Sequence, residues 1–290
     1  MKNKITFFVL AFSFFLLACQ KDDAIVITDN IAPPDYTIES VIVDSYINKL
    51  YISLIGREPT ETEFEEAKNL LGQEVSQENR IFLIETIQNE SDYTDHQVDI
   101  FIQDYLNGID TNRIKEDYID LYENLIEIED VPFIIENLVQ SLDRLNDLYN
   151  IQADFKQNTI DVIEVHRRII HNVVYDDINM GIENYIVSVS QHFLHRYPTT
   201  SELESATSML EGEQSFCFGG NGDDKIDFNN LFFNHDGYYE GQVITAFNKL
   251  LYRNPTSFEQ TNLAQQFKQD KSFHNLQKAI LITNEFVGIE

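Results

Sequence analysis

The sequence predicts an all-α protein in which three-helix repeat units are joined by capped Pro-Thr corners, with a helical insertion between the first and second copies. Two observations predict this class. The pattern R-x-P-T-x-x-E occurs three times, at 57–63, 196–202 and 253–259. Apolar residues recur at helical spacing on both sides of every copy and through the segment 97–180.

Residues 1–18 are expected to form a secretory signal peptide, since Lys2 and Lys4 precede an uncharged apolar stretch. This stretch is too short to span a bilayer as a helix. Residues 19–38 contain two adjacent prolines and lack helical periodicity, which is typical of a tether.

The end of the signal segment resembles the lipobox of bacterial lipoproteins, because "LLAC" places Cys19 where a lipid would be attached. The resemblance implies a protein anchored by lipid at Cys19 rather than one that spans the membrane. The alternative is a plain signal peptide that ends near a cysteine. "QKDD", which follows, resembles the export signal of surface lipoproteins of the Bacteroidota and so implies the outer face of the outer membrane. Acylation of Cys19 would leave Cys217 without an intramolecular disulfide partner.

Acidic residues heavily outnumber basic ones. The chain holds 49 Asp and Glu against 20 Lys and Arg, a formal charge of −29 at pH 7. Because no basic surplus exists to displace the counterions of a phosphate backbone, nucleic acid is not expected as a partner. The apolar fraction of 43% is too high for a disordered acidic chain, so the acids are expected on the solvated face of a packed fold.

Each copy of the repeated pattern predicts a capping box. The Thr hydroxyl is expected to accept a hydrogen bond from the third backbone N–H of the new helix, while the Glu carboxylate accepts one from the Thr N–H. The Pro cannot continue the helix from upstream, and the Arg complements the carbonyl end of that helix. The pattern is therefore predicted to be structural. Its residues are Arg57, Pro59, Thr60 and Glu63; Arg196, Pro198, Thr199 and Glu202; and Arg253, Pro255, Thr256 and Glu259.

A third apolar segment follows each capped helix, which sets the expected boundaries. The repeats are expected at 39–96, 181–240 and 241–290. Residues 97–180 are predicted to form the insertion that packs the first repeat against the later two, with a second domain as the alternative.

The stretches "YISLIGREPTETEFEEAKNLL" and "LIETIQNESDY" resemble a Y-x-x-L-x-G-R-x-P unit that ends in an apolar helix and N-S-x-[EDG]-[YF]. That unit belongs to a repeat domain of unknown function in secreted bacterial proteins, and phycobilisome linker domains have a similar rhythm. The resemblance covers roughly 40–96 and 180–288, and it implies a helical repeat without an active site. The later copies carry His195 and Tyr252 where the unit has Gly.

The stretch "GGNGDDKID" at 219–227 fits the calcium-binding nonapeptide G-G-x-G-x-D-x-U-x. That nonapeptide works by stacking successive turns, whereas this chain has one copy, so a flexible Gly-rich loop is the competing interpretation. Ca²⁺ is thus a candidate cofactor rather than an assigned one. The candidate oxygen ligands are Asp223, Asp224, Asp227 and Asp236.

Two histidines, His192 and His195, are three residues apart and would share a helical face, as zinc ligands can. No third ligand is visible in the sequence, so a metal-dependent hydrolase is a weaker hypothesis. His166 and His171 flank two arginines and are expected to be surface or capping residues.

Cys217 could act as a nucleophile beside His235, but the sequence shows no orienting group, so a half-buried free thiol is expected. Tyr238 and Tyr239 follow the Gly-rich loop and are the candidates for a recognition surface.

These observations predict a non-enzymatic lipoprotein of the outer membrane, exposed on the cell surface, that serves as an interaction or scaffold module for a protein partner. The alternatives are a calcium-dependent ligand-binding module that uses the loop 219–236 and a metal-dependent hydrolase.

Overall fold

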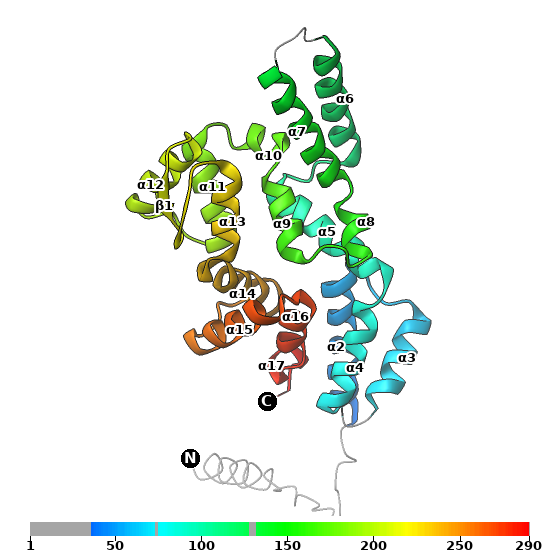
Figure 1. Ribbon diagram of the computed structural model, residues 1–290. Helices are drawn as coiled ribbons and strands as arrows, with labels where there is room; N and C mark the ends of the chain where they lie inside the picture. Colours follow the sequence, from blue (N-terminus) through cyan, green and yellow to red (C-terminus); the bar gives the residue numbers. More distant parts are fainter. Residues whose placement is uncertain (1–35, 73–74, 128–131, 290) are drawn as a thin grey trace, which may run out of the picture. The chain divides into compact units, whose positions relative to one another are not determined.

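The computed structural model describes residues 36–72, 75–127 and 132–289. The predicted signal peptide, Cys19 and most of the predicted tether lie outside the described residues. The described chain is almost entirely helical, which confirms the all-α class, and its sixteen helices can be followed in Figure 1. Their bounds are α2 Tyr36–Ile55, α3 Glu61–Leu71, α4 Gln77–Gln88, α5 Ser91–Tyr105, α6 Thr111–Glu127, α7 Pro132–Tyr149, α8 Ile151–Lys156, α9 Val162–Ile170, α10 Val173–Ile178, α11 Ile182–Leu194, α12 Thr200–Leu210, α13 Lys225–Asn234, α14 Asp236–Leu251, α15 Ser257–Asp270, α16 Phe273–Leu281 and α17 Asn284–Val287.

Short polar side chains fix where many of these helices begin. Nine of the described helices have an Asp, Asn, Ser or Thr N-cap whose side chain accepts a hydrogen bond from the backbone N–H three residues on. This bond satisfies a donor that the first turn would otherwise leave unpaired. The nine N-caps are Thr60, Ser76, Asp161, Asn172, Thr199, Asp224, Thr256, Ser272 and Thr283.

The described chain departs from pure helix at one β-hairpin. Its strands are β1 (Ser215–Cys217) and β2 (Gly220–Gly222), which pair antiparallel. The two residues that join them, Phe218 and Gly219, have φ values of +48° and +87°. Two positive φ angles in a two-residue turn match the right-handed twist of the flanking strands. The hairpin occupies the place where a Gly-rich loop was the competing prediction.

The boundaries predicted at 96/97 and 240/241 fall inside α5 and α14. Each of these two helices runs continuously across the predicted boundary. From Ser40 onward the described residues form one compact unit.

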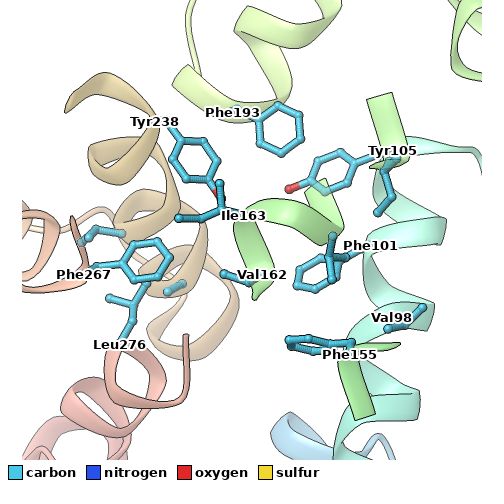
Figure 2. Close-up of a cluster of buried hydrophobic side chains, with 14 of the residues drawn as sticks. Val98, Phe101, Tyr105, Phe155, Val162, Ile163, Phe193, Tyr238, Phe267 and Leu276 are labelled. Atoms are coloured by element: carbon cyan, nitrogen blue, oxygen red, sulfur yellow. The ribbon is translucent and has the colours of Figure 1, made fainter. Parts of the chain in front are cut away.

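The core of this unit is rich in aromatic side chains and joins helices far apart in the sequence. Figure 2 shows side chains from α5, α8, α9, α11, α14, α15 and α16 meeting in one buried cluster. Helices of the predicted insertion therefore share a core with helices of the second and third copies. The labelled members are Val98, Phe101, Tyr105, Phe155, Val162, Ile163, Phe193, Tyr238, Phe267 and Leu276.

Close packing of α11 against α14 depends on one glycine. A Cβ atom built on Gly241 would lie 1.7 Å from the carbonyl oxygen of Phe193. Backbone cannot move aside as a flexible side chain can, so only glycine permits this approach.

None of the described helices is both long enough and apolar enough to cross a membrane.

Candidate functional site

The three R-x-P-T-x-x-E corners share one geometry. In each, the Thr hydroxyl accepts a hydrogen bond from the Glu N–H, and the Thr N–H donates to the Glu carboxylate over 2.6–2.7 Å. The Arg forms two parallel hydrogen bonds to the same carboxylate, as Arg196 does with Glu202 at 2.7 Å each. It also donates to the carbonyl of the residue that follows it. The Arg was predicted to complement the carbonyl end of the helix before the corner, but its side chain instead bonds forward to the cap.

These ion pairs hold the capping carboxylates in their charged form. Hydrogen bonds from the Arg, followed by those from the Thr, lower the pKa of Glu63, Glu202 and Glu259 to about 2. A carboxylate with so low a pKa is a poor proton carrier near neutral pH. The corner residues are therefore explained by local structure.

The residue before each corner Arg adopts the left-handed backbone conformation. Its φ is +73° at Gly56 and +54° at both His195 and Tyr252. For a residue with a Cβ atom this conformation is less stable by roughly 1–2 kcal/mol. The same turn thus occurs with and without glycine, and in each copy the ion pair and the cap hold the chain directly after this residue.

A second acidic partner distinguishes the corners. Arg57 also pairs with Asp92 at 3.1 Å, and Arg253 also pairs with Glu285 at 2.6 Å. Among the described residues Arg196 pairs with Glu202 alone. The second corner therefore has one ion-pair partner fewer than the other two.

Three of the four aspartates predicted as calcium ligands have side-chain partners within the protein. Asp224 is the N-cap of α13 and accepts from the Asp227 N–H at 2.7 Å, while Asp227 accepts from the Asp223 N–H at 3.2 Å. Asp236 pairs with Lys268 at 2.5 Å. No three His, Cys, Asp or Glu side chains come together to hold a metal ion anywhere in the described ranges. The structure thus gives the calcium prediction no support from a ligand cluster in the described residues.

The glycines of this stretch have packing reasons instead. A Cβ atom on Gly220 would lie 2.2 Å from Cδ2 of Leu231, and one on Gly222 would lie 2.4 Å from Cβ of Asp227. Gly219 supplies a positive φ to the hairpin turn. The G-G-x-G spacing therefore fits a hairpin laid against α13.

Tyr238 and Tyr239 do not form a recognition surface, because their side chains are 0% and 1% exposed. The Tyr238 hydroxyl lies 2.8 Å from Nδ1 of His166, and the Tyr239 hydroxyl accepts a hydrogen bond from Lys271. Both rings lie on the face of α14 that is buried in the aromatic core. The sequence-based prediction of a surface here is wrong.

The two histidines predicted as metal ligands have separate partners. Nδ1 of His192 lies 3.0 Å from the Tyr175 hydroxyl, and Nε2 of His195 lies 2.7 Å from Oγ1 of Thr245. No third ligand joins them within the described part of the chain. The geometry gives no support to the hydrolase hypothesis.

His166 lies in the core rather than at the surface. Its side chain is 0% exposed, and its ring centroid lies 4.6 Å from that of Phe101 and 5.1 Å from that of Phe193. Burial lowers the pKa of His166 to about 3, so its ring is neutral at physiological pH. His171 is the C-cap residue of α9.

Cys217 is buried, 4% exposed, and its thiol donates to the carbonyl of Glu202 over 3.8 Å. Burial raises the pKa of Cys217 to about 11. The His235 ring packs against Phe218 at 5.3 Å. Since the thiolate is the nucleophilic form, this cysteine is not activated.

The surface with most exposed apolar side chains lies on α6 and α7, which run side by side (Figure 1). Eight of the nineteen large apolar side chains exposed in the described chain belong to these two helices, so this pair stands out from the rest. A hollow of about 430 Å³ lies between them, and it is lined by Ile114, Lys115, Tyr118, Ile119, Leu145, Asn146 and Tyr149. We use the name α6–α7 groove for this hollow together with six exposed apolar side chains in it or beside it: Tyr118, Ile119, Tyr122, Ile126, Val139 and Tyr149.

The sequence predicts for this segment only a packing role between the repeats. The available signal was the width of the apolar stripe. On α6 the stripe includes Ile114 and Leu121, which face the core, and also Ile119, Tyr122 and Ile126, which do not. A stripe wider than one neighbouring helix can cover indicates a further partner.

A smaller cavity of about 220 Å³ lies among α2, α5, α14 and α16. Phe101 and Phe273 are among its apolar walls, and Asp104 and Lys249 form an ion pair at its lining. Because these two charges satisfy each other, the cavity presents no free charge from this pair to a ligand.

No protein-family model, curated protein or solved structure matches this chain.

Proposed function

We propose that this chain is a non-enzymatic lipoprotein, anchored through Cys19 and displayed on the cell surface, that binds a protein partner through the α6–α7 groove. The predicted lipobox supports the anchor, and the acidic residues after Cys19 support the surface address. A lipid-anchored chain held at the cell surface can bind other molecules only through its solvent-exposed side chains.

The exposed groove is the observation that carries this proposal. Ile126 is 66% exposed, Ile119 is 52% exposed and Tyr122 is 50% exposed, all on one face of α6. Large apolar side chains gathered on one face mark interaction sites in soluble proteins. Tyrosine is also enriched where protein interfaces contribute most binding energy.

We further propose that the three corners mark three-helix repeat units and that these units form the frame on which α6 and α7 are held. The support is the shared corner geometry: a capping box, a paired Arg and a left-handed residue before it in each copy. In this interpretation the repeats supply rigidity, and the insertion supplies the binding face.

Photo-crosslinking on intact cells tests the proposed function. A photoreactive amino acid placed at Ile119 or Tyr122 should crosslink the chain to another protein. The same residue placed at Phe258, which is 77% exposed on α15, serves as the control. A product seen from the groove positions and absent from Phe258 supports the proposal; crosslinks that are equal at all three sites, or absent at all three, would reject it.

A further inference from the structure

The apolar part of the α6–α7 groove has acidic borders on both sides. On α6, Glu116 and Glu123 lie three residues before and four residues after Ile119, so all three share one side of the helix. On α7, Glu136 and Asp143 stand in the same relation to Val139. All four carboxylates are exposed.

The two helices therefore repeat the same arrangement, acid, apolar, acid, at the same spacing. The helices α6 and α7 pack as an antiparallel pair. Two residues that lie at the same angle around their own helix axes, measured from the side that contacts the other helix, therefore point toward the same face of the pair. Lys115 is also part of the groove lining, but it lies over the Tyr149 ring with its Nζ 5.5 Å from the ring centroid. The long edges of the groove are thus acidic, and its lining is apolar apart from Lys115 and Asn146.

We propose that the α6–α7 groove binds an amphipathic helix of another protein, one whose apolar stripe is bordered on both sides by Lys or Arg. This inference rests on the function proposed above and names the chemistry of the partner. A helix fits the site because a groove between two packed helices accepts a third helix by the same side-chain interdigitation.

The dimensions and charge of the groove agree with this partner. The exposed residues of α6 from Tyr118 to Ile126 extend over roughly 12 Å, about two turns of a docked helix. Basic borders on the partner would meet Glu116 and Glu123 on one side and Glu136 and Asp143 on the other. A second copy of this chain is a poor fit, because its groove would bring the same acidic borders against these.

Three synthetic helical peptides test the proposal. They share one apolar stripe and differ only at the bordering positions, which are Lys, Glu or Gln. Binding is measured to the chain carrying Cys19→Ser, which cannot be lipidated and can be studied without detergent. The Lys-bordered peptide should bind at least about tenfold more tightly than the Glu-bordered one, and added salt should reduce this difference.

Charge reversal at the groove supplies the decisive comparison. In the variant with Glu116→Lys, Glu123→Lys, Glu136→Lys and Asp143→Lys, the preference should switch to the Glu-bordered peptide. A matched control reverses four exposed carboxylates elsewhere and should keep the original preference. The control positions are Glu65, Glu66, Glu204 and Glu240.

The outcomes separate this inference from the proposed function. Equal binding of the three peptides, or an unchanged preference after reversal at the groove, would overturn the basic partner while crosslinking from Ile119 still supported the interaction surface. A dimer in sedimentation equilibrium that Ile119→Glu dissociates would assign the groove to a second copy, and it too would overturn this inference. Loss of crosslinking from the groove positions would reject the proposed function itself.

Discussion

At the scale of single residues, the corner glutamates combine two tasks that are usually separate. Glu202 accepts from the Thr199 N–H at 2.7 Å and pairs with Arg196 through both carboxylate oxygens. A cap holds the start of a helix, and a bidentate pair holds the turn before it. One side chain therefore stabilises both sides of the corner.

Glu202→Ala should lower the free energy of unfolding by about 1–2 kcal/mol, because both the cap and the ion pair are lost. Denaturant unfolding near pH 7 measures the effect. Glu204→Ala, an exposed change on the same helix, should stay within about 0.5 kcal/mol of the unsubstituted chain. Equal effects of the two changes would show that the corner contributes nothing special.

The neutral state of His166 predicts how stability depends on acid. Its pKa is about 3 in the folded chain, below the usual 6.5, so the unfolded chain binds more protons between these two values. Stability should be fully present above pH 6.5 and should fall toward pH 3, with a slope of up to about 1.4 kcal/mol per pH unit from this residue. His171, whose pKa is also lowered to about 3 by burial, contributes in the same direction.

The contribution of His166 can be isolated by substitution. Urea unfolding across this pH range should show a shallower slope for His166→Gln than for the unsubstituted chain. Phe155→Leu, a core change that removes no titrating group, should lower stability without changing the slope. An unchanged slope in His166→Gln would mean that this ring is not held neutral by burial.

At the scale of elements, the hairpin and α13 explain the stretch that resembled a calcium site. Asp224→Ala removes the N-cap of α13 and should cost about 1 kcal/mol, whereas Asp223→Ala, the adjacent exposed carboxylate, should cost much less. Calcium should not change the melting temperature of any of the three chains. A calcium-dependent rise in the unsubstituted chain, lost in both variants, would restore the calcium interpretation.

The contact between α11 and α14 has little tolerance for added volume. Gly241→Ala would place a Cβ atom 1.7 Å from the Phe193 carbonyl oxygen, so the two helices must separate. The expected loss is about 2 kcal/mol or more in the free energy of unfolding. Glu240→Ala, at the neighbouring exposed position of α14, is the control and should have little effect. A Gly241→Ala chain as stable as this control would contradict the close helix contact.

At the scale of the whole molecule, the proposed function needs both an anchor and a free binding face. Cys19→Ser should abolish incorporation of labelled palmitate and release the chain from the membrane fraction. Cys217→Ser should leave labelling unchanged and so controls for the loss of a cysteine. Absence of labelling in the unsubstituted chain would favour the plain signal peptide that the sequence left open, and labelling that survives Cys19→Ser would place the lipid on another residue.

Contacts between residues close together in the sequence could be predicted, whereas contacts between distant residues could not. The capping boxes could be derived from the sequence because Arg57, Thr60 and Glu63 lie within seven residues, and the bonds among them depend little on the rest of the fold. The burial of Tyr238 could not, because it depends on His166, 72 residues away. The sequence showed an aromatic pair after a loop, and that pattern suits a surface as well as a core.

The α6–α7 groove, the proposed binding surface, could not be predicted from the sequence for the same reason. The sequence displays the apolar stripe and the acids beside it, but it does not say how much of the stripe a neighbouring helix covers. Ile114 and Ile119 are both apolar positions of α6, yet one is 4% exposed and the other 52% exposed. Only the packing of α6 in the folded chain distinguishes them.

By itself, the sequence determined the all-α class and the starts of the three helices that follow the repeated pattern, because these follow from bonds between near neighbours. The tertiary structure alone decided that the Gly-rich stretch is a hairpin, that Tyr238 and Tyr239 are buried, and that one face of α6 and α7 is left open. The physical reason is that burial and exposure depend on contacts between segments far apart in the chain, and a local pattern of residues carries no record of which segment will cover it.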